Sequence, residues 1–371
     1  MEHIFTINIK AILEKHLGEM SQEVFEKSQL IQYINQKTQS AHQGSKARSS
    51  FANLYALYVL IEDYIANGYY NNTGYSKYEG AAYIKLLNRQ RALPFGNKLQ
   101  NHALNNRLNT EFQKYFPRTE YIPILRNLET NRYWINENLL KITINSTTCN
   151  ISKAILEIIE EYIKTKQDAF ERFIKSCEEL QKIQNTSPAK VEEFIIDLLA
   201  PNVDARLFEI VSYSILKHFY HDQQMIWGFD KDKLNVENLK LYKTGRTNAN
   251  DGGIDFVMKP LGRFFQVTET LDFKKFFLDI DKIQRYPITF VIKSVEPTHV
   301  LLEKIRDNAN RTYSIKAIVD RYMECIEEVI NIPTLMERFK SAVKQQYLNK
   351  ILQEIILQSK VEFNYAEIEN L

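Results

Sequence analysis

The sequence predicts a mixed α and β protein that is mostly helical, with an N-terminal helical domain, a small α/β core and a C-terminal helical extension. Gly and Pro are scarce, at 11 and 9 of 371 residues, whereas Tyr and Phe number 21 each, so turns are few. Long apolar runs repeat at helical spacing through most of the chain. In the second half the expected order is helix, strand, strand, strand, helix, strand, which is typical of an α/β core.

Composition indicates a globular protein with a neutral overall charge. The chain is 44% hydrophobic and 25% charged, and its formal charge of +2 neither supports nor excludes nucleic acid as a partner. Cys149, Cys177 and Cys325 lie far apart without a CxxC pair, so we expect neither a zinc site nor a disulfide framework. No apolar run approaches the roughly 20 residues of a membrane span, and the N-terminus does not resemble a signal peptide. We therefore expect a cytoplasmic protein with no membrane association.

The first half of the chain is expected to form helices separated by polar segments. Apolar residues recur at helical spacing around Leu54, Leu57 and Ile61. The expected helices cover 22–35, 50–66, 78–91 and 97–115, followed by an extended stretch over 132–145 and a long amphipathic helix or helix pair over 151–183. Ser187-Pro188 then signals a new helix start. We place the domain division there, giving domains of residues 1–186 and 187–371.

The second half combines helices with short strands. Helices are expected over 189–199, 203–220 and 272–285, and strands over 238–242, 251–258, 263–268 and 288–293. The turn at Pro260-Leu261-Gly262 joins two of these strands into a hairpin. Residues 298–371 are expected to be predominantly helical. Their apolar run Met336–Leu357 fits a contact surface between two copies and core packing equally well.

The hairpin carries the polar residues that point to chemistry. Asp255 opens the first strand, and Gln266 and Thr268 lie near the end of the second. Alternation places Gln266 and Thr268 on one face and Val267 on the other. If the hairpin brings Asp255 beside them, a carboxylate, an amide oxygen and a hydroxyl converge at one strand end. A divalent cation that acts on a phosphodiester needs such an arrangement.

These residues resemble the core of the PD-(D/E)xK nuclease superfamily, whose best-known members are type II restriction endonucleases. Asp255 matches the Asp of the first strand, and Gln266-Val267-Thr268 matches the (D/E/Q)-x-K triplet of the second. Glu209, in the expected helix 203–220, matches the acid that a preceding helix often contributes. The resemblance covers about residues 195–295 and implies a restriction-endonuclease-like α/β core. The sequence departs from the pattern at Thr268, where the family usually has Lys.

The resemblance implies Mg²⁺-dependent hydrolysis of phosphodiester bonds in double-stranded DNA, at a specific sequence and by a homodimer. Asp255 would anchor the metal, with the backbone carbonyl of Val267 and the side-chain oxygen of Gln266 as further ligands. Glu209 would assist, and Thr268 would position the attacking water without supplying a positive charge. The candidates for the missing lysine are Lys293 and Lys274, and the reserve ligands are Glu269 and Asp251 should the register differ by one residue.

Two segments are candidates for DNA contact. Along 98–109, the polar side chains Lys98, Asn101 and Asn105 line one helix face, and amides and lysines pair with base edges. A solvated face or a buried amide network between helices would explain this pattern as well. Near the candidate site, the loop 243–248 offers Lys243 and Arg246 for phosphate contacts, and its alternative is an exposed polar loop. Phosphate contacts are also expected from Lys46 and Arg48 in the first domain.

Two other classes of function fit the sequence. The core could be a degenerate nuclease fold that binds DNA without cutting it, as the Gln and Thr in the triplet favour. Alternatively, the chain is a helical interaction scaffold with no nucleic-acid ligand, as its neutral charge favours.

Overall fold

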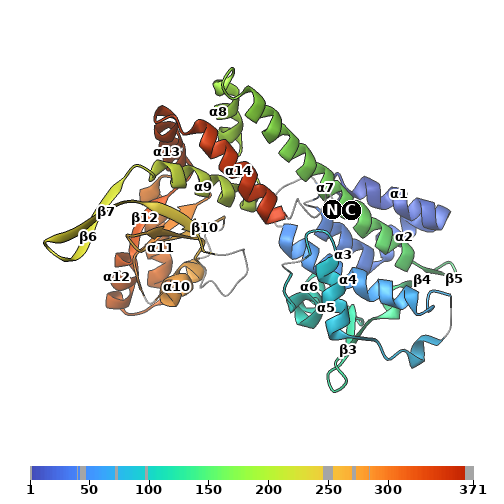
Figure 1. Ribbon diagram of the computed structural model, residues 1–371. Helices are drawn as coiled ribbons and strands as arrows, with labels where there is room; N and C mark the ends of the chain where they lie inside the picture. The colour runs from blue at the N-terminus through green and yellow to red at the C-terminus, as the bar shows by residue number, and fades with distance from the viewer. Residues whose placement is uncertain are drawn as a thin grey trace. The chain divides into compact units, whose positions relative to one another are not determined.

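The computed structural model describes residues 2–39, 41, 47–71, 74–96, 99–244, 254–269, 273–283 and 285–363, without the side chains of 47–49, 273–275, 282 and 363. The chain divides into two compact units, Met1–Arg172 and Phe173–Leu371. The division lies within helix α7 (Ser152–Ile183), which is continuous across it (Figure 1). The division drawn from the sequence falls after residue 186, just past the end of the same helix.

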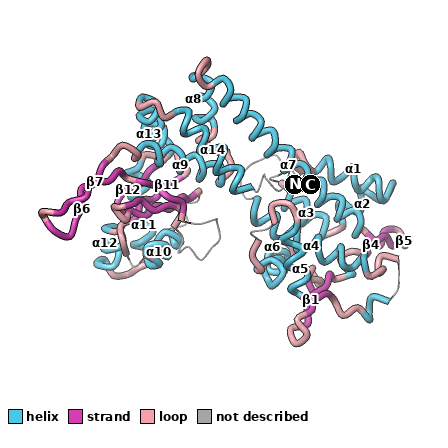
Figure 2. The backbone as a smooth tube through the Cα atoms, viewed as in Figure 1, coloured by secondary structure: helices cyan, strands magenta, loops and turns pink. Residues whose placement is uncertain are grey.

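The first unit is helical with two small antiparallel sheets (Figure 2). Its helices are α1 (Thr6–Leu17), α2 (Ser21–Lys27), α3 (Gln29–Thr38), α4 (Ala47–Ala66), α5 (Tyr83–Ala92), α6 (Leu108–Tyr115) and the first part of α7. One sheet has the order β1 (Ala81–Ala82), β3 (Arg132–Ile135), β2 (Ile124–Asn127), and the other pairs β4 (Lys141–Ile144) with β5 (Thr147–Asn150).

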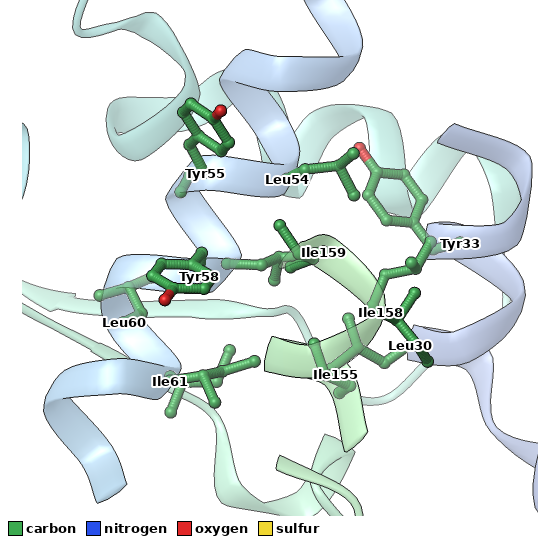
Figure 3. Packing of buried hydrophobic residues seen from close by; sticks show 14 of the residues in the cluster. Leu30, Tyr33, Leu54, Tyr55, Tyr58, Leu60, Ile61, Ile155, Ile158 and Ile159 are labelled. Atoms are coloured by element: carbon green, nitrogen blue, oxygen red, sulfur yellow. The ribbon is translucent and has the colours of Figure 1, made fainter. Parts of the chain in front are cut away.

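Helix α4 lies at the centre of the first unit's core. The predicted apolar residues Leu54, Leu57 and Ile61 are each fully buried. Figure 3 shows α4 side chains against Ile155 and Ile159 of α7, with residues of α3 beside them. Burial of this stripe holds α4 against its neighbours, because each fully buried aliphatic side chain stabilises the fold by about 1.5–3 kcal/mol.

The second unit contains a sheet between two layers of helices. Its helices are α8 (Pro188–Asp197), α9 (Ala205–Phe219), α10 (Phe273–Lys282), α11 (Thr298–Thr312), α12 (Lys316–Glu324), α13 (Ile332–Lys344) and α14 (Leu348–Phe363). Its strands are β6 (Gln224–Asp230), β7 (Lys233–Asn238), β8 (Lys240–Lys243), β9 (Phe256–Lys259), β10 (Arg263–Thr268), β11 (Ile288–Ile292) and β12 (Ile326–Ile330). Strands β6 and β7 form a separate hairpin that extends away from the helices of this unit (Figure 1).

The main sheet has five strands in the order β12-β11-β10-β9-β8. Strands β8, β9 and β10 are antiparallel neighbours, and α10 then connects β10 to the parallel strand β11. One face packs Phe256, Phe265 and Val291 against α9, α13 and α14. The other face packs Phe290 and Ile292 against α10, α11 and α12. Because both faces of β11 are covered, all five of its residues are buried, and four of them are apolar.

The structure differs from the expected elements at several places. Ser28 splits the expected helix 22–35 by capping α3, and the expected helix 97–115 begins instead with a π-helical turn at Ala103–Arg107 before α6. No prediction covered the helix α1, the strands β1 and β2, the hairpin β6–β7 or the strand β12. The apolar run Met336–Leu357 packs in the core through residues such as Ile351 and Ile355. This is the core-packing interpretation of the run. In the described part of the chain no helix is long and apolar enough to cross a membrane.

Candidate active site

Asp255 lies immediately before β9 and faces the end of β10. Its backbone N–H donates to the carbonyl of Phe265 at 2.9 Å. The register pairs Phe265 with Phe256, so the next pair outward is Gln266 with Asp255. The Asp255 carboxylate accepts a hydrogen bond from the backbone N–H of Val267, with 2.7 Å between Oδ2 and N. The hairpin therefore brings Asp255 against the triplet, as the sequence predicted.

Gln266 and Val267 place two more oxygens at this strand end. The side-chain amide of Gln266 donates to the Val267 carbonyl at 3.3 Å. Its oxygen, Oε1, is buried and has no hydrogen-bond partner among the described residues. Val267 itself packs on the α9 face of the sheet, which leaves Gln266 and Thr268 on the opposite face, as strand alternation requires. Burying an amide oxygen without a hydrogen-bond partner costs folding free energy, and a bound ion or water at this position would satisfy it.

The predicted helical acid lies on the α9 side of the sheet, paired with a lysine. Glu209 Oε1 is 2.8 Å from Lys243 Nζ, and both side chains are largely buried. Lys243 is the last residue of β8 and pairs in register with Phe256, directly after Asp255. Glu209 is thus one strand away from Asp255 but on the α9 face of the sheet, opposite to the face that carries Asp255, and Lys243 compensates its charge. Its assistance in catalysis stays a prediction.

A second ion pair lies at the end of β10 and β11. Lys293 Nζ is 2.8 Å from Glu269 Oε1, also donates to the Val203 carbonyl, and is only 3% exposed. The Lys293 backbone N–H donates to the Thr268 carbonyl at 2.9 Å. Of the two lysines proposed for the missing motif position, Lys293 is therefore beside the triplet. The side chain of the other, Lys274, lies outside the described residues.

Tyr213 fixes α9 on the sheet beneath the Glu209–Lys243 pair. Its hydroxyl donates to the Leu241 carbonyl of β8 at 3.2 Å, and its ring contacts Phe256. Burial raises the pKa of Tyr213 to about 12, so the hydroxyl stays protonated and remains a donor at neutral pH. Asp204 accepts the N–H groups of Arg206 and Leu207 and caps the start of the same helix. Together these contacts set the position of Glu209 over β8.

The oxygens at the strand end fit a hard divalent cation such as Mg²⁺. Asp255 offers a carboxylate, Val267 a carbonyl and Gln266 the partnerless amide oxygen. Mg²⁺ binds through one or two carboxylates while water and substrate phosphate complete its shell. Within the described ranges, no group of three or more His, Cys, Asp or Glu side chains is gathered for a metal. A site here would therefore depend on Asp255 and the two neutral oxygens. The reserve ligand Asp251 lies outside the described residues.

The amide side chains of the segment 98–109 are mostly used inside the first unit. Asn105 accepts from the Tyr133 hydroxyl at 3.3 Å, and Asn109 bonds both backbone groups of Ile124. Asn101 is exposed. The buried-network interpretation thus describes the packing of Asn105 and Asn109. Lys46, Lys98, Arg246 and the Arg48 side chain lie outside the described residues.

Sequence reasoning missed an open part of the sheet next to Asp255. On the face opposite α9, strands β8 and β9 present Lys240, Tyr242 and Lys259 to solvent, while Leu241 and Met258 are buried on the α9 face. The alternation of polar and apolar residues in Lys240–Lys243 was the available signal.

Comparison of the chain with protein-family models, with curated proteins and with solved structures found no match.

Proposed function

We propose that this protein is a Mg²⁺-dependent endonuclease that hydrolyses phosphodiester bonds in double-stranded DNA. The observation that carries the proposal is the convergence of Asp255, Gln266 and the Val267 carbonyl at the adjoining ends of β9 and β10. Apart from the separate hairpin β6–β7, the order α9, β8, β9, β10, α10, β11 supports it, because the PD-(D/E)xK resemblance implies a succession of helix, three strands, helix and strand.

Each residue has a distinct role in the proposed chemistry. Asp255, Gln266 and Val267 would hold Mg²⁺, which supplies charge neutralisation on the phosphate and activation of water. The Thr268 hydroxyl can orient a water by hydrogen bonding but brings no positive charge. Lys293, whose backbone N–H bonds the Thr268 carbonyl and whose ammonium is held by Glu269 on the α9 face, would supply the positive charge of the motif lysine. Glu209 would assist indirectly, by holding Lys243, because α9 covers the face opposite Asp255.

The proposed action on double-stranded DNA includes a homodimer and a specific recognition sequence, as the resemblance implies. One site of this kind hydrolyses one strand, so a break through both strands is made most directly by two copies. Lys243, at the end of β8, is the described residue best placed for phosphate contact near the site.

A non-catalytic DNA-binding protein is the second candidate, and one observation favours it. Glu209 and Glu269 are each paired with a lysine at 2.8 Å, so their carboxylates are compensated within the chain. A single carboxylate with neutral oxygens binds Mg²⁺ more weakly than two carboxylates would. On this alternative the strand end would bind DNA without cutting it.

The deciding experiment compares the wild type with Asp255→Asn on long unmethylated DNA, with Mg²⁺ or with EDTA. Asparagine keeps the shape of the side chain and an oxygen that can accept from Val267 N–H, but removes the charge. We expect discrete fragments from the wild type in Mg²⁺ only, and a loss on the order of a hundredfold or more in the variant. Asp232→Asn, in the exposed turn between β6 and β7, is the matched control and should cut like the wild type.

The other outcomes separate the alternatives. A folded wild type that binds DNA with a strong salt dependence but never cuts it would favour the non-catalytic binder. A folded wild type that neither cuts nor binds DNA would favour the third class of function, a helical interaction scaffold.

A further inference from the structure

The face of the sheet that carries Asp255 and Gln266 continues into an uncovered surface over β8 and β9. Register pairs Lys240 with Lys259 and Tyr242 with Val257. Strand alternation puts these residues on the same face as Asp255, because Phe256 and Met258 point to α9. Tyr242 is 45% exposed, and both lysines are exposed. We call Lys240, Tyr242 and Lys259 the open face.

The charge of these strands is entirely positive. Strands β8, β9 and β10 contain Lys240, Lys243, Lys259 and Arg263 and no acidic residue. Lys243 pairs with Glu209, and Arg263 pairs with Glu327 and Glu328 of β12. In the described part of the chain, neither Lys240 nor Lys259 pairs with a carboxylate. An exposed sheet surface with two uncompensated lysines is complementary to a polyanion.

Tyr242 supplies a flat surface beside the paired lysines. The Lys259 ammonium lies 5.6 Å from the centroid of the Tyr242 ring, so the aromatic ring and the charge are presented together. Aromatic rings flanked by basic side chains contact the sugars or bases of a nucleic-acid strand while the lysines contact its phosphates. Along β9, Lys259 lies about 13 Å from Asp255, since each residue advances the strand by about 3.3 Å.

We infer that the open face binds the sugar–phosphate backbone of the DNA strand that runs from the scissile phosphate, with Lys240 and Lys259 on phosphates and Tyr242 against a sugar. The inference rests on the proposed function, since it takes the position of the scissile phosphate from Asp255. It adds a binding surface that positions the substrate, remote from the residues that would hold Mg²⁺.

The test measures binding of a short DNA duplex in EDTA, where no cleavage can occur, across a series of salt concentrations. For Lys240→Ala/Lys259→Ala we expect about ten- to hundredfold weaker binding at low salt. The slope of log affinity against log salt should become shallower by about two, because two phosphate contacts are lost. Lys231→Ala/Lys233→Ala, at the turn of β6–β7, removes the same charge from exposed positions of the same unit and should match the wild type.

Tyr242 provides a second measurement that does not depend on charge. Tyr242→Ala should weaken binding by about tenfold with an unchanged salt slope, whereas Tyr242→Phe should bind like the wild type. Equal affinities and slopes for the two lysine double variants would overturn the inference, and Asp255-dependent cleavage by the wild type would then still stand. A wild type that binds no duplex in EDTA and cuts none in Mg²⁺ would overturn both proposals together.

Discussion

Asn109 is a polar side chain in the core of the first unit, where its amide takes the place of a neighbouring strand as the hydrogen-bond partner of Ile124. Its side-chain N–H₂ donates to the Ile124 carbonyl and its oxygen accepts from the Ile124 N–H, both at 2.9 Å. Asn109 is 9% exposed, so water cannot easily substitute for either bond. The side chain therefore connects α6 to the first residue of β2 through two bonds that only an amide can make together.

Asn109→Asp should destabilise the protein by about 1–3 kcal/mol. A carboxylate still accepts from the Ile124 N–H, but it places a second acceptor against the Ile124 carbonyl and leaves both without a donor. Asn106→Asp makes the same chemical change at an exposed position of the π-helical turn that precedes α6 and should alter the free energy of unfolding by less than about 0.5 kcal/mol. Urea unfolding measures both. Equal stabilities for the two variants would contradict the role given to Asn109.

At the candidate site, the residues within one hairpin could be predicted and those that depend on packing between elements could not. Asp255 and Gln266 follow from alternation and a short turn, both of which are local in sequence. The pairing of Glu209 with Lys243 depends on where α9 docks on β8, through contacts such as Tyr213 with Phe256. Sequence spacing carries no information on that docking.

At the scale of elements, α9 meets the turn between α13 and α14 through stacked rings. His218 of α9 stacks on Tyr347 with ring centroids 5.4 Å apart, and Tyr347 donates its hydroxyl to Asp222. Both ring nitrogens of His218 are buried without hydrogen-bond partners among the described residues. Burial, together with the nearby Lys217 ammonium, lowers the pKa of His218 to about 4. The ring is therefore neutral in the folded protein at neutral pH.

This histidine should make the second unit less stable in mild acid. Above about pH 6.5 the ring is neutral in both states and has no effect on stability. Between about pH 6.5 and 4 the unfolded chain takes up a proton that the folded protein does not, so the free energy of unfolding falls by about 1.4 kcal/mol per pH unit.

His218→Phe keeps a ring for stacking on Tyr347 and removes the titration. We expect the wild type to lose stability relative to this variant as the pH falls from 6.5 to 4, and the two to run parallel from pH 7 to 8. Melting temperatures measured across this range test the prediction. Parallel curves throughout would show that the ring is protonated in the folded state or reached by water.

The elements that could be predicted are those with one strong apolar period. Helix α4 and strand β11 carry mostly apolar residues over the expected length, and both lie where the sequence placed them. The β6–β7 hairpin was missed because Ile226, Leu234 and Val236 are exposed, so its pattern does not mark a buried face. Strand β12 was missed because its Glu327 and Glu328 interrupt a short apolar run between two helices.

At the scale of the whole molecule, each unit has hydrophobic clusters of its own. The buried cluster of the first unit runs from Phe5 to Ile163, and the two clusters of the second unit contain residues from Cys177 onward. Among the described residues, no residue of the second unit belongs to the cluster of the first unit, and none of the first unit belongs to the clusters of the second. Units with separate cores unfold as separate cooperative transitions when their mutual stabilisation is small.

We therefore expect calorimetry to show two transitions that respond to different substitutions. Leu54→Ala removes a fully buried side chain from the first unit's core, and Ile351→Ala does the same in the second unit. Each should cost about 2–5 kcal/mol in its own unit, because the cavity adds to the lost burial. Leu54→Ala should lower one melting temperature and Ile351→Ala the other. A single transition shifted equally by both substitutions would instead mean that the two cores fold as one cooperative unit, with α7 transmitting the loss across the boundary at Arg172.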